Sequence, residues 1–192
     1  MDMSSFCNMR SFAPYDKTKQ DQPQASKKER RVRTSTEWDV RIDCDQTYVE
    51  EIIKNLKASR HLITYALVSG LEQPDEVKYG SKDIHCHIAL IVEYNMRRDQ
   101  VLALCRGHVK KTDEYCSPRN RKFTYAGWYL HHTKLDYKLV LEPAQRLEIG
   151  VLPDDELTDD NKKEVARMIK KFGCDEAAHE TIMRIKFAKY LQ

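Results

Sequence analysis

The sequence predicts an α+β fold, with a central antiparallel five-stranded sheet of the split βαβ (ferredoxin/RRM-like) type. Helices are expected on one face of the sheet, with further helices at the C-terminus. Strand-like segments with two-residue alternation are interleaved with segments that carry the apolar stripe of amphipathic helices, in the order β-α-β-β-α-β. The chain has 192 residues, of which 41% are hydrophobic, and this suits one compact domain with tails.

The first strand and the first helix have the clearest patterns. Between Trp38 and Cys44, apolar residues alternate with charged ones, which predicts a strand with one buried and one wet face. Asp45 is a suitable N-cap for a helix over residues 46–58. The apolar stripe of this helix consists of Val49, Ile52, Ile53 and Leu56.

The middle of the chain predicts three further elements and a helix stop. We expect a second strand over roughly residues 62–72, a third strand over 84–94 and a helix over 97–106. Gly107 is expected to end this helix, since glycine adopts the left-handed conformation of a helix C-cap. A fourth strand is expected over 108–115.

Residues 117–122 predict a basic loop, residues 123–133 a third helix, and residues 139–141 a short last strand. The acidic stretch 153–160 is then followed by two helices. The stripe of the first is formed by Val165, Met168, Ile169 and Phe172. The stripe of the second is formed by Ala178, Ile182 and Ile185.

Composition divides the chain into three parts. Residues 1–34 are polar and without periodicity, and we expect a disordered basic tail. Residues 35–150 form the expected folded domain, and residues 151–192 an acidic linker with a helical C-terminal segment. The run Lys27–Arg33 in the tail is typical of a nuclear localisation signal or a DNA-binding arm, and equally of a solvated charged linker.

The charge balance limits the partners that the whole surface can attract. The formal net charge is only +3, so contact with nucleic acid requires a local cluster of Lys and Arg. The six cysteines contain no CxxC pair, which indicates reduced thiols in a reducing compartment. The sequence has no signal peptide and no apolar run of about 18 residues. We expect a soluble intracellular protein without a membrane partner.

The most informative segment is the strand that contains His85 and His87. On a strand these two side chains point to the same face, while Cys86, Ile88 and Leu90 point to the other. Two imidazoles on one face are able to chelate a divalent ion. The plainer interpretation is a pair of exposed strand histidines, because a bare His-x-His is common.

Glu72 is a candidate third metal ligand. It lies in phase with Ala66 and Val68 along the preceding strand. If that strand pairs antiparallel with the histidine strand, the carboxylate reaches the same ion. Two histidines and one carboxylate leave open positions for a phosphate oxygen and water, which suits Mg²⁺ or Mn²⁺ acting as a Lewis acid.

The expected third helix carries a candidate nucleophile. Tyr125 and Tyr129 lie one turn apart and share a helix face, with His132 on the same face and Lys134 just beyond. A phenol beside imidazole or ammonium groups ionises more easily and attacks phosphorus to give a phosphotyrosyl intermediate. For Phe123 and Trp128 we favour a core role instead.

Basic residues near this helix are candidate phosphate contacts. Arg119, Arg121 and Lys122 lie together in the expected loop, and Arg41 lies on the wet face of the first strand. Clustered Arg and Lys bind phosphate groups without reading sequence.

Taken together, these segments resemble the replication initiator (Rep) endonuclease domain of small circular single-stranded DNA viruses of eukaryotes, such as circoviruses and their relatives. The resemblance covers about residues 36–140. The family's first motif is matched in position by Trp38–Cys44, and its histidine motif by His85-Cys86-His87. The family's glutamate ligand is matched by Glu72, and its tyrosine, usually in Tyr-x-x-Lys on a helix, by Tyr129.

The resemblance implies an HUH endonuclease domain at residues 35–150, with a divalent metal. It implies nicking of single-stranded DNA at an origin stem-loop, 5′ covalent attachment to tyrosine, and rejoining after a round of rolling-circle replication. It also implies a viral protein in the host nucleus. The chain has no GxxxxGK[ST] loop of an ATPase, so we expect either the first domain of a longer protein with a helicase or a stand-alone nuclease. The C-terminal helices would then begin a self-association segment.

Three departures from the family pattern matter. The first motif lacks the usual Thr, Leu and Asn residues. His132 replaces the lysine three residues after Tyr129, so His132 or Lys134 takes its role. Tyr115, in Glu114-Tyr-Cys-Ser117, is an alternative nucleophile, although Pro118 stands in its lysine position. The pair Tyr125 and Tyr129 is also similar to two-tyrosine phage initiators.

Two other classes of function fit parts of the pattern. The same fold serves catalytically silent DNA- or RNA-binding modules, which carry aromatic residues on the central strands where this chain has histidines. HUH transposases share the metal pair and the tyrosine but place the tyrosine farther downstream. Covalent attachment of Tyr129 to DNA separates the nuclease from the silent module.

Overall fold

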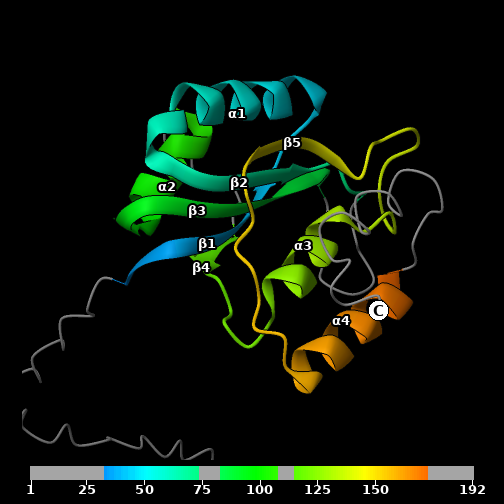
Figure 1. Cartoon of the computed structure of the whole chain (residues 1–192). Coiled ribbons are helices and arrows are strands. Elements are labelled where there is room, and N and C mark those ends of the chain that lie inside the picture. The colour runs from blue at the N-terminus through cyan, green and yellow to red at the C-terminus, as the bar shows by residue number, and fades with distance from the viewer. Residues whose placement is uncertain (1–32, 74–82, 108–114, 173–192) are drawn as a thin grey trace, which may run out of the picture. The chain divides into compact units, whose positions relative to one another are not determined.

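The computed structural model describes residues 33–73, 83–107 and 115–172. The chain divides into two units, Met1–Arg31 and Val32–Gln192, and all described residues belong to the second. Its centre is a five-stranded antiparallel sheet in the order β4-β1-β3-β2-β5 (Figure 1). The strands are β1 (Thr34–Asp43), β2 (Ile63–Ser69), β3 (His85–Arg97), β4 (Tyr115–Pro118) and β5 (Gln145–Gly150). The predicted α+β class and the five-stranded antiparallel sheet are confirmed, with β5 added beside β2 of the split βαβ unit, but helices cover both faces of the sheet and not one.

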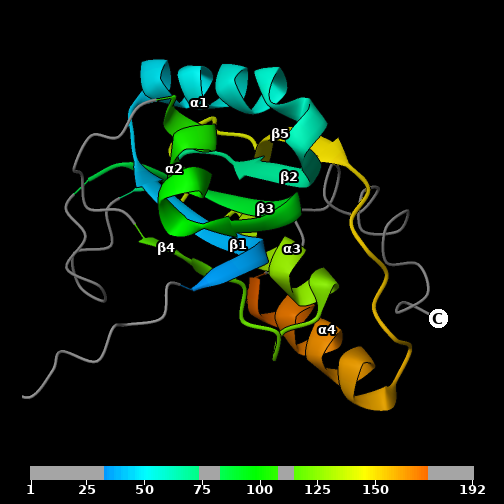
Figure 2. The same cartoon turned by 90° about the vertical axis from the view of Figure 1, so that its left-hand side faces the viewer.

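Two helices, α1 (Gln46–Ala58) and α2 (Arg98–Arg106), cover one face of the sheet (Figure 2). A short 3₁₀ turn, Arg60–Leu62, leads from α1 into β2. The predicted stripe of α1 is buried against the sheet, and the Asp45 side chain caps the helix by accepting from Tyr48 N at 2.8 Å. Gly107 ends α2 with φ at 69°, as expected of a left-handed C-cap.

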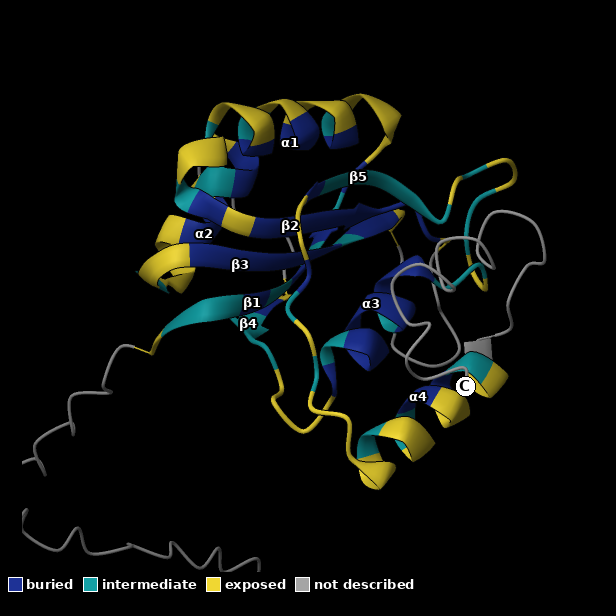
Figure 3. Ribbon diagram, viewed as in Figure 1, coloured by how far each residue is buried: buried dark blue, intermediate teal, exposed yellow. Residues whose placement is uncertain are grey.

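The other face of the sheet is covered by α3 (Tyr125–Thr133) and α4 (Asp159–Phe172). These helices and alternate residues of β2 and β3 form a second core, so the central strands are buried on both faces (Figure 3). Carboxylates from the C-terminal segment hold the start of α3. The Asp155 oxygens accept from Tyr125 N at 2.6 Å and Ala126 N at 2.8 Å, where a helix leaves its amides without partners.

The C-terminal segment is therefore built into the same core as the sheet. Val165 and Met168 of α4 are buried in the second core, and the Glu164 carboxylate accepts from Thr124 N at 3.0 Å. The predicted stripe of this helix is confirmed at these positions. The further helix expected beyond residue 173 lies outside the described residues.

Two predicted strand positions are wrong. The last strand is not residues 139–141 but β5, because Leu141 has a positive φ of 69° and is 99% exposed. Residues 115–118, placed partly in a loop by sequence, form β4 beside β1. The expected strand residues 108–114 and the basic tail up to residue 32 lie outside the described residues.

Candidate metal centre

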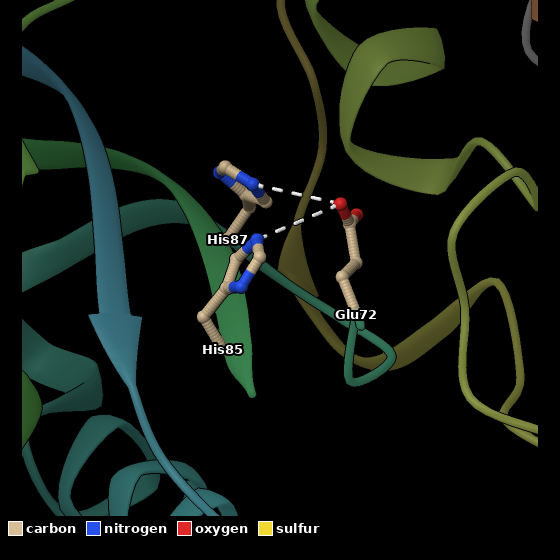
Figure 4. A group of neighbouring side chains, drawn as sticks. All are labelled: Glu72, His85 and His87. Atoms are coloured by element: carbon tan, nitrogen blue, oxygen red, sulfur yellow. Dashed lines mark ion pairs between the residues drawn. The ribbon is translucent and has the colours of Figure 1, made fainter. Parts of the chain in front are cut away.

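Three side chains with metal-binding atoms meet on the sheet face that lies under α3. The ligand atoms of Glu72, His85 and His87 all lie within 4.8 Å of one another (Figure 4). His85 Nε2 is 3.8 Å and His87 Nε2 is 3.7 Å from Glu72 Oε2. The three predicted metal ligands are therefore brought together, and they could hold one metal ion.

The alternation of β3 places both histidines on this face, as predicted. Cys86 and Ile88 point into the core under α1 and α2, whereas Ala89 and Ile91, in phase with the histidines, pack in the second core. His85 Nδ1 lies 3.1 Å from Asp83 O, an atom that only accepts. Nδ1 therefore carries the proton, and the free lone pair is on Nε2, which faces Glu72. This is the tautomer that binds a metal through Nε2.

Glu72 reaches the histidines by a route that differs from the prediction. Ala66 and Val68, with which Glu72 was expected to be in phase, point into the core on the opposite face. Two paired positions, Val68↔Ile88 and Glu72↔His85, frame this segment. Between them, the chain that continues β2 has one more residue than β3 has. This extra residue has the effect of a β-bulge and turns the Glu72 side chain to the histidine face.

Gly70 and Ser69 hold this irregular segment. A Cβ at Gly70 would lie 2.0 Å from Pro143 O, so a side chain does not fit there. Ser69 Oγ accepts from His87 N at 2.9 Å and donates to Gly70 O at 2.8 Å. The hydroxyl thus replaces the regular ladder bond where the strand departs from its register.

Two lysines compensate the Glu72 charge. Lys134 Nζ lies 3.2 Å from Oε2 and Lys138 Nζ 2.6 Å from Oε1, and the lysine side chains are 12% and 4% exposed. Burial alone would raise the Glu72 pKa, but the two ammonium groups hold it below its usual value. Lys138 was not found from the sequence, because no motif singles it out and residues 139–141 beside it were expected to be a strand.

The histidines around the carboxylate are held neutral. Burial lowers the pKa of His85 and, more strongly, of His87, where the neighbouring histidines and Lys134 add to the effect. His131 of α3, whose ring centre is 5.9 Å from that of His87, has its pKa lowered to about 4, mainly by burial. A neutral imidazole is the form that binds a metal.

Tyr129, the predicted nucleophile, lies on α3 above the same sheet face but is only 2% exposed. Its hydroxyl donates to Gln145 Oε1 at 3.0 Å, and burial raises its pKa. Gln145 pairs with Ser69, whose hydroxyl accepts the His87 amide. A short series of contacts thus joins the phenol to the histidine strand.

His132 and Lys134, the alternatives for the motif lysine, have different positions. His132 is fully buried, with Nε2 3.0 Å from Asp39 Oδ1 and Nδ1 2.8 Å from Trp128 O. It supports the helix on the sheet. The Lys134 ammonium contacts one of the three candidate metal ligands, Glu72.

The other two candidate tyrosines differ in their access. The Tyr125 hydroxyl donates to Glu37 Oε1 at 2.8 Å, on β1, so it does not join Tyr129 as the two-tyrosine interpretation requires. Tyr115, on β4, is 55% exposed. In the sheet register, Arg41 of β1 stands opposite His87 of β3 on one side and Tyr115 of β4 on the other. Residues that stand opposite one another point to the same face, so Tyr115 lies on the histidine face.

The predicted phosphate contacts also separate into two kinds. Arg119 is 6% exposed and donates to Glu37 Oε2 at 2.8 Å, while its guanidinium lies 4.1 Å from the Tyr125 ring centre. Arg41 forms an ion pair with Asp43 at 2.8 Å.

The other two predicted contacts are open to solvent. The Arg121 side chain is 74% exposed, and Lys122 is exposed. Only these last two are presented to solvent as the prediction expects.

No protein-family model matches this chain, and no curated protein matches it. Within the described part of the chain, no helix has the length and apolar character needed to cross a membrane.

Proposed function

We propose that this chain is a metal-dependent endonuclease of the HUH type, which nicks and rejoins single-stranded DNA through a tyrosine nucleophile. The observation that carries the proposal is the meeting of Glu72, His85 and His87 on one sheet face beneath a tyrosine-bearing helix. A bulge and a glycine are needed to bring the carboxylate there. A chance pair of strand histidines would not require either.

The charges of the site suit a phosphodiester. Glu72 supplies one negative charge, while Lys134 and Lys138 supply two positive ones. The histidines are neutral, since burial lowers their pKa values. A bound Mg²⁺ or Mn²⁺ would polarise the scissile phosphate as a Lewis acid. The surplus positive charge of the lysines attracts the phosphate and stabilises the charge that develops on its oxygens.

The proposed covalent step is a transesterification. The tyrosine oxygen forms a bond to phosphorus, the bond from phosphorus to the 3′ oxygen breaks, and the 3′ oxygen leaves with a proton. The product is a 5′-phosphotyrosine, and attack by a 3′ hydroxyl reverses the step and rejoins the strand. Lys134, whose ammonium lies beside Glu72, is the residue that we propose to hold the phosphate oxygens.

Tyr129 is the proposed nucleophile, because it lies on the helix above the histidine face. Its hydroxyl must leave Gln145 before it attacks. Tyr115 is the alternative, because it is exposed and lies in the same sheet row as His87. The proposed DNA contacts outside the centre are Arg121 and Lys122, whose side chains are exposed.

The proposal is tested by trapping the covalent intermediate. Labelled single-stranded stem-loop oligonucleotides, and a randomised single-stranded pool, are incubated with the full chain and Mn²⁺, with and without EDTA. An SDS-resistant adduct is expected in the wild type and in Tyr94→Phe, a control at an exposed tyrosine of β3. The adduct is expected to be lost in Tyr129→Phe and in EDTA. Loss in Tyr115→Phe alone would move the nucleophile to β4.

One observation favours a second candidate function. The Tyr129 phenol is buried and hydrogen-bonded, and burial raises its pKa, as in a residue that serves packing. A catalytically silent module that binds nucleic acid accounts for this. DNA binding without an adduct from any oligonucleotide of the pool would favour the silent module.

The biological setting of the proposed nuclease follows from the same resemblance. We propose a viral protein of the host nucleus that acts at an origin stem-loop, with self-association or a helicase in a longer parent protein. The nuclear location rests on the run Lys27–Arg33. A fusion of residues 1–35 to a fluorescent protein is expected to enter the nucleus, and a fusion that stays outside would remove this support.

A further inference from the structure

A loop with exposed apolar side chains lies between α3 and β5. Tyr137 is 54% exposed, Val140 85% and Leu141 99%. The loop projects from the sheet edge beside the start of β5 (Figure 1). Large apolar side chains that are gathered at one exposed place indicate a binding surface more often than chance exposure does.

The backbone of this loop is held in a costly conformation. Tyr137 and Leu141 have positive φ angles of 70° and 69°, in the left-handed region that non-glycine residues rarely adopt. Each such residue costs on the order of 1 kcal/mol. Tyr137, Val140 and Leu141 are exposed in this conformation, whereas Lys138 and Leu139 between them are partly buried.

The residues between the exposed ones fix the loop to the metal centre. Gln73 N donates to Tyr137 O at 2.7 Å and Leu139 N donates to Leu71 O at 3.0 Å. The Leu139 side chain packs on the core under α1, and the Lys138 ammonium contacts Glu72 at 2.6 Å. The loop is therefore anchored to the bulged segment that carries Glu72.

One charged group of the centre, the Lys134 ammonium, lies over the Tyr137 ring. Lys134 Nζ lies 5.5 Å from the ring centre and 3.2 Å from Glu72 Oε2. One lysine thus contacts both the exposed aromatic ring and the metal-binding carboxylate. An aromatic face next to a cation is the combination that binds single-stranded nucleic acid, because bases stack on the ring while the cation attracts the phosphates.

We propose that Tyr137 is a stacking platform for an unpaired base next to the phosphate held at the metal centre, with Val140 and Leu141 as apolar contacts of the same strand. This inference rests on the proposed function for its choice of single-stranded DNA. A duplex offers no free base face at this position, so the platform selects single strands. The platform works without metal, since its contacts are the ring, Lys134 and the two apolar side chains.

The test measures binding of a fluorescent oligothymidylate to the full chain in EDTA, by anisotropy. Tyr137→Ala is expected to weaken binding by about fivefold to a hundredfold, the usual loss for one stacked base. Tyr137→Phe keeps the ring and is expected to bind like the wild type. Tyr94→Ala removes an exposed tyrosine of β3 and controls for general aromatic loss. Binding of a duplex of equal length is expected to be the same in all four proteins.

A second readout identifies the contact itself. An oligonucleotide with 5-bromouracil is irradiated on the wild type, and the cross-linked peptide is expected to contain Tyr137. Unchanged oligothymidylate affinity in Tyr137→Ala, or cross-links only outside residues 134–142, would overturn the platform. The platform would also be overturned if substitutions in the loop changed only the self-association of the protein, measured by analytical sedimentation. If Tyr137→Ala binds oligothymidylate more weakly but the wild type forms no covalent adduct, the platform would be retained and the nuclease overturned.

Discussion

Glu72 faces His85 in an isolated antiparallel bridge, in which Glu72 N donates to His85 O at 2.8 Å and His85 N donates to Glu72 O at 3.2 Å. The pair lies one residue out of step with the register of β2 and β3. Because of this step, a carboxylate that regular alternation would send to the opposite core points at two imidazoles. The candidate metal centre thus depends on a backbone irregularity as much as on its three side chains.

Gly70→Ala is expected to damage the metal centre without touching a ligand. The new Cβ would lie 2.0 Å from Pro143 O, so the bulged segment must shift, at a cost of about 1–3 kcal/mol. Urea denaturation measures the stability and titration calorimetry the affinity for Mn²⁺, and both are expected to fall. In Gly107→Ala, the nearest atom lies 3.4 Å from the new Cβ, at Asn55. This control should lose stability but keep its metal affinity, and equal metal affinity in both variants would contradict the account.

Lys138→Met is expected to make folding depend on metal. The buried Glu72 carboxylate loses the closer of its two ammonium partners, and removal of one member of a buried pair costs about 3 kcal/mol. A divalent ion replaces the lost charge, so Mn²⁺ should raise the melting temperature of the variant more than that of the wild type. Lys163→Met, on the exposed face of α4, should respond to Mn²⁺ as the wild type does. An equal response in all three proteins would exclude charge compensation by Lys138.

The metal-free protein is expected to lose stability in acid. Burial lowers the pKa of His85, His87 and His131 in the folded state, the last to about 4. In the unfolded chain these histidines bind protons at a pKa near 6.5. Their contribution to the free energy of unfolding is therefore fully present above pH 6.5. It falls as the pH drops toward the folded pKa values, by about 1.4 kcal/mol per pH unit for each proton taken up on unfolding. Urea denaturation in EDTA at several pH values measures the slope, and a flat profile between pH 6.5 and 4.5 would refute this explanation.

The buried contact between Asp39 and His132 is expected to act as an ion pair. His132 Nδ1 faces Trp128 O and Nε2 faces Asp39 Oδ1, so both ring nitrogens need a proton if Asp39 is ionised. Burial would raise the Asp39 pKa, but the His132 hydrogen bond and charge hold it below its usual value. Asp39→Asn should cost about 3 kcal/mol, and a double-mutant cycle with His132→Gln should show coupling. Additive losses would argue against the pair.

The fold could be predicted wherever local pattern and burial agree. The helix over 46–58 was placed at its observed bounds because its cap and stripe coincide. β5 was missed because Gln145–Gly150 buries only Ile149 and is otherwise polar or half exposed. The apolar run Leu139–Leu141 is more typical of a strand, but Leu141 has a positive φ, which a strand does not adopt.

The site was predictable in its histidines and not in its surroundings. Alternation alone places His85 and His87 on one face. Glu72 lies beside them as predicted, but not in phase with Ala66 and Val68, which point to the opposite face. The bulge depends on Gly70 passing Pro143, a contact between residues that are far apart in sequence. Lys138 and Gln145 enter the site through the same return of the chain, which no motif of this sequence marks.

The central claim is that Glu72, His85 and His87 bind one divalent ion, and electron paramagnetic resonance of Mn²⁺ tests it most directly. The wild type is expected to bind one Mn²⁺ ion per chain, with hyperfine signals from coordinated imidazole nitrogen. Glu72→Gln and His87→Gln should lose this signal while circular dichroism remains that of a folded protein, and His61→Gln, at an exposed histidine away from the centre, should keep it. A wild type without bound Mn²⁺, or variants that bind it equally well, would contradict the account.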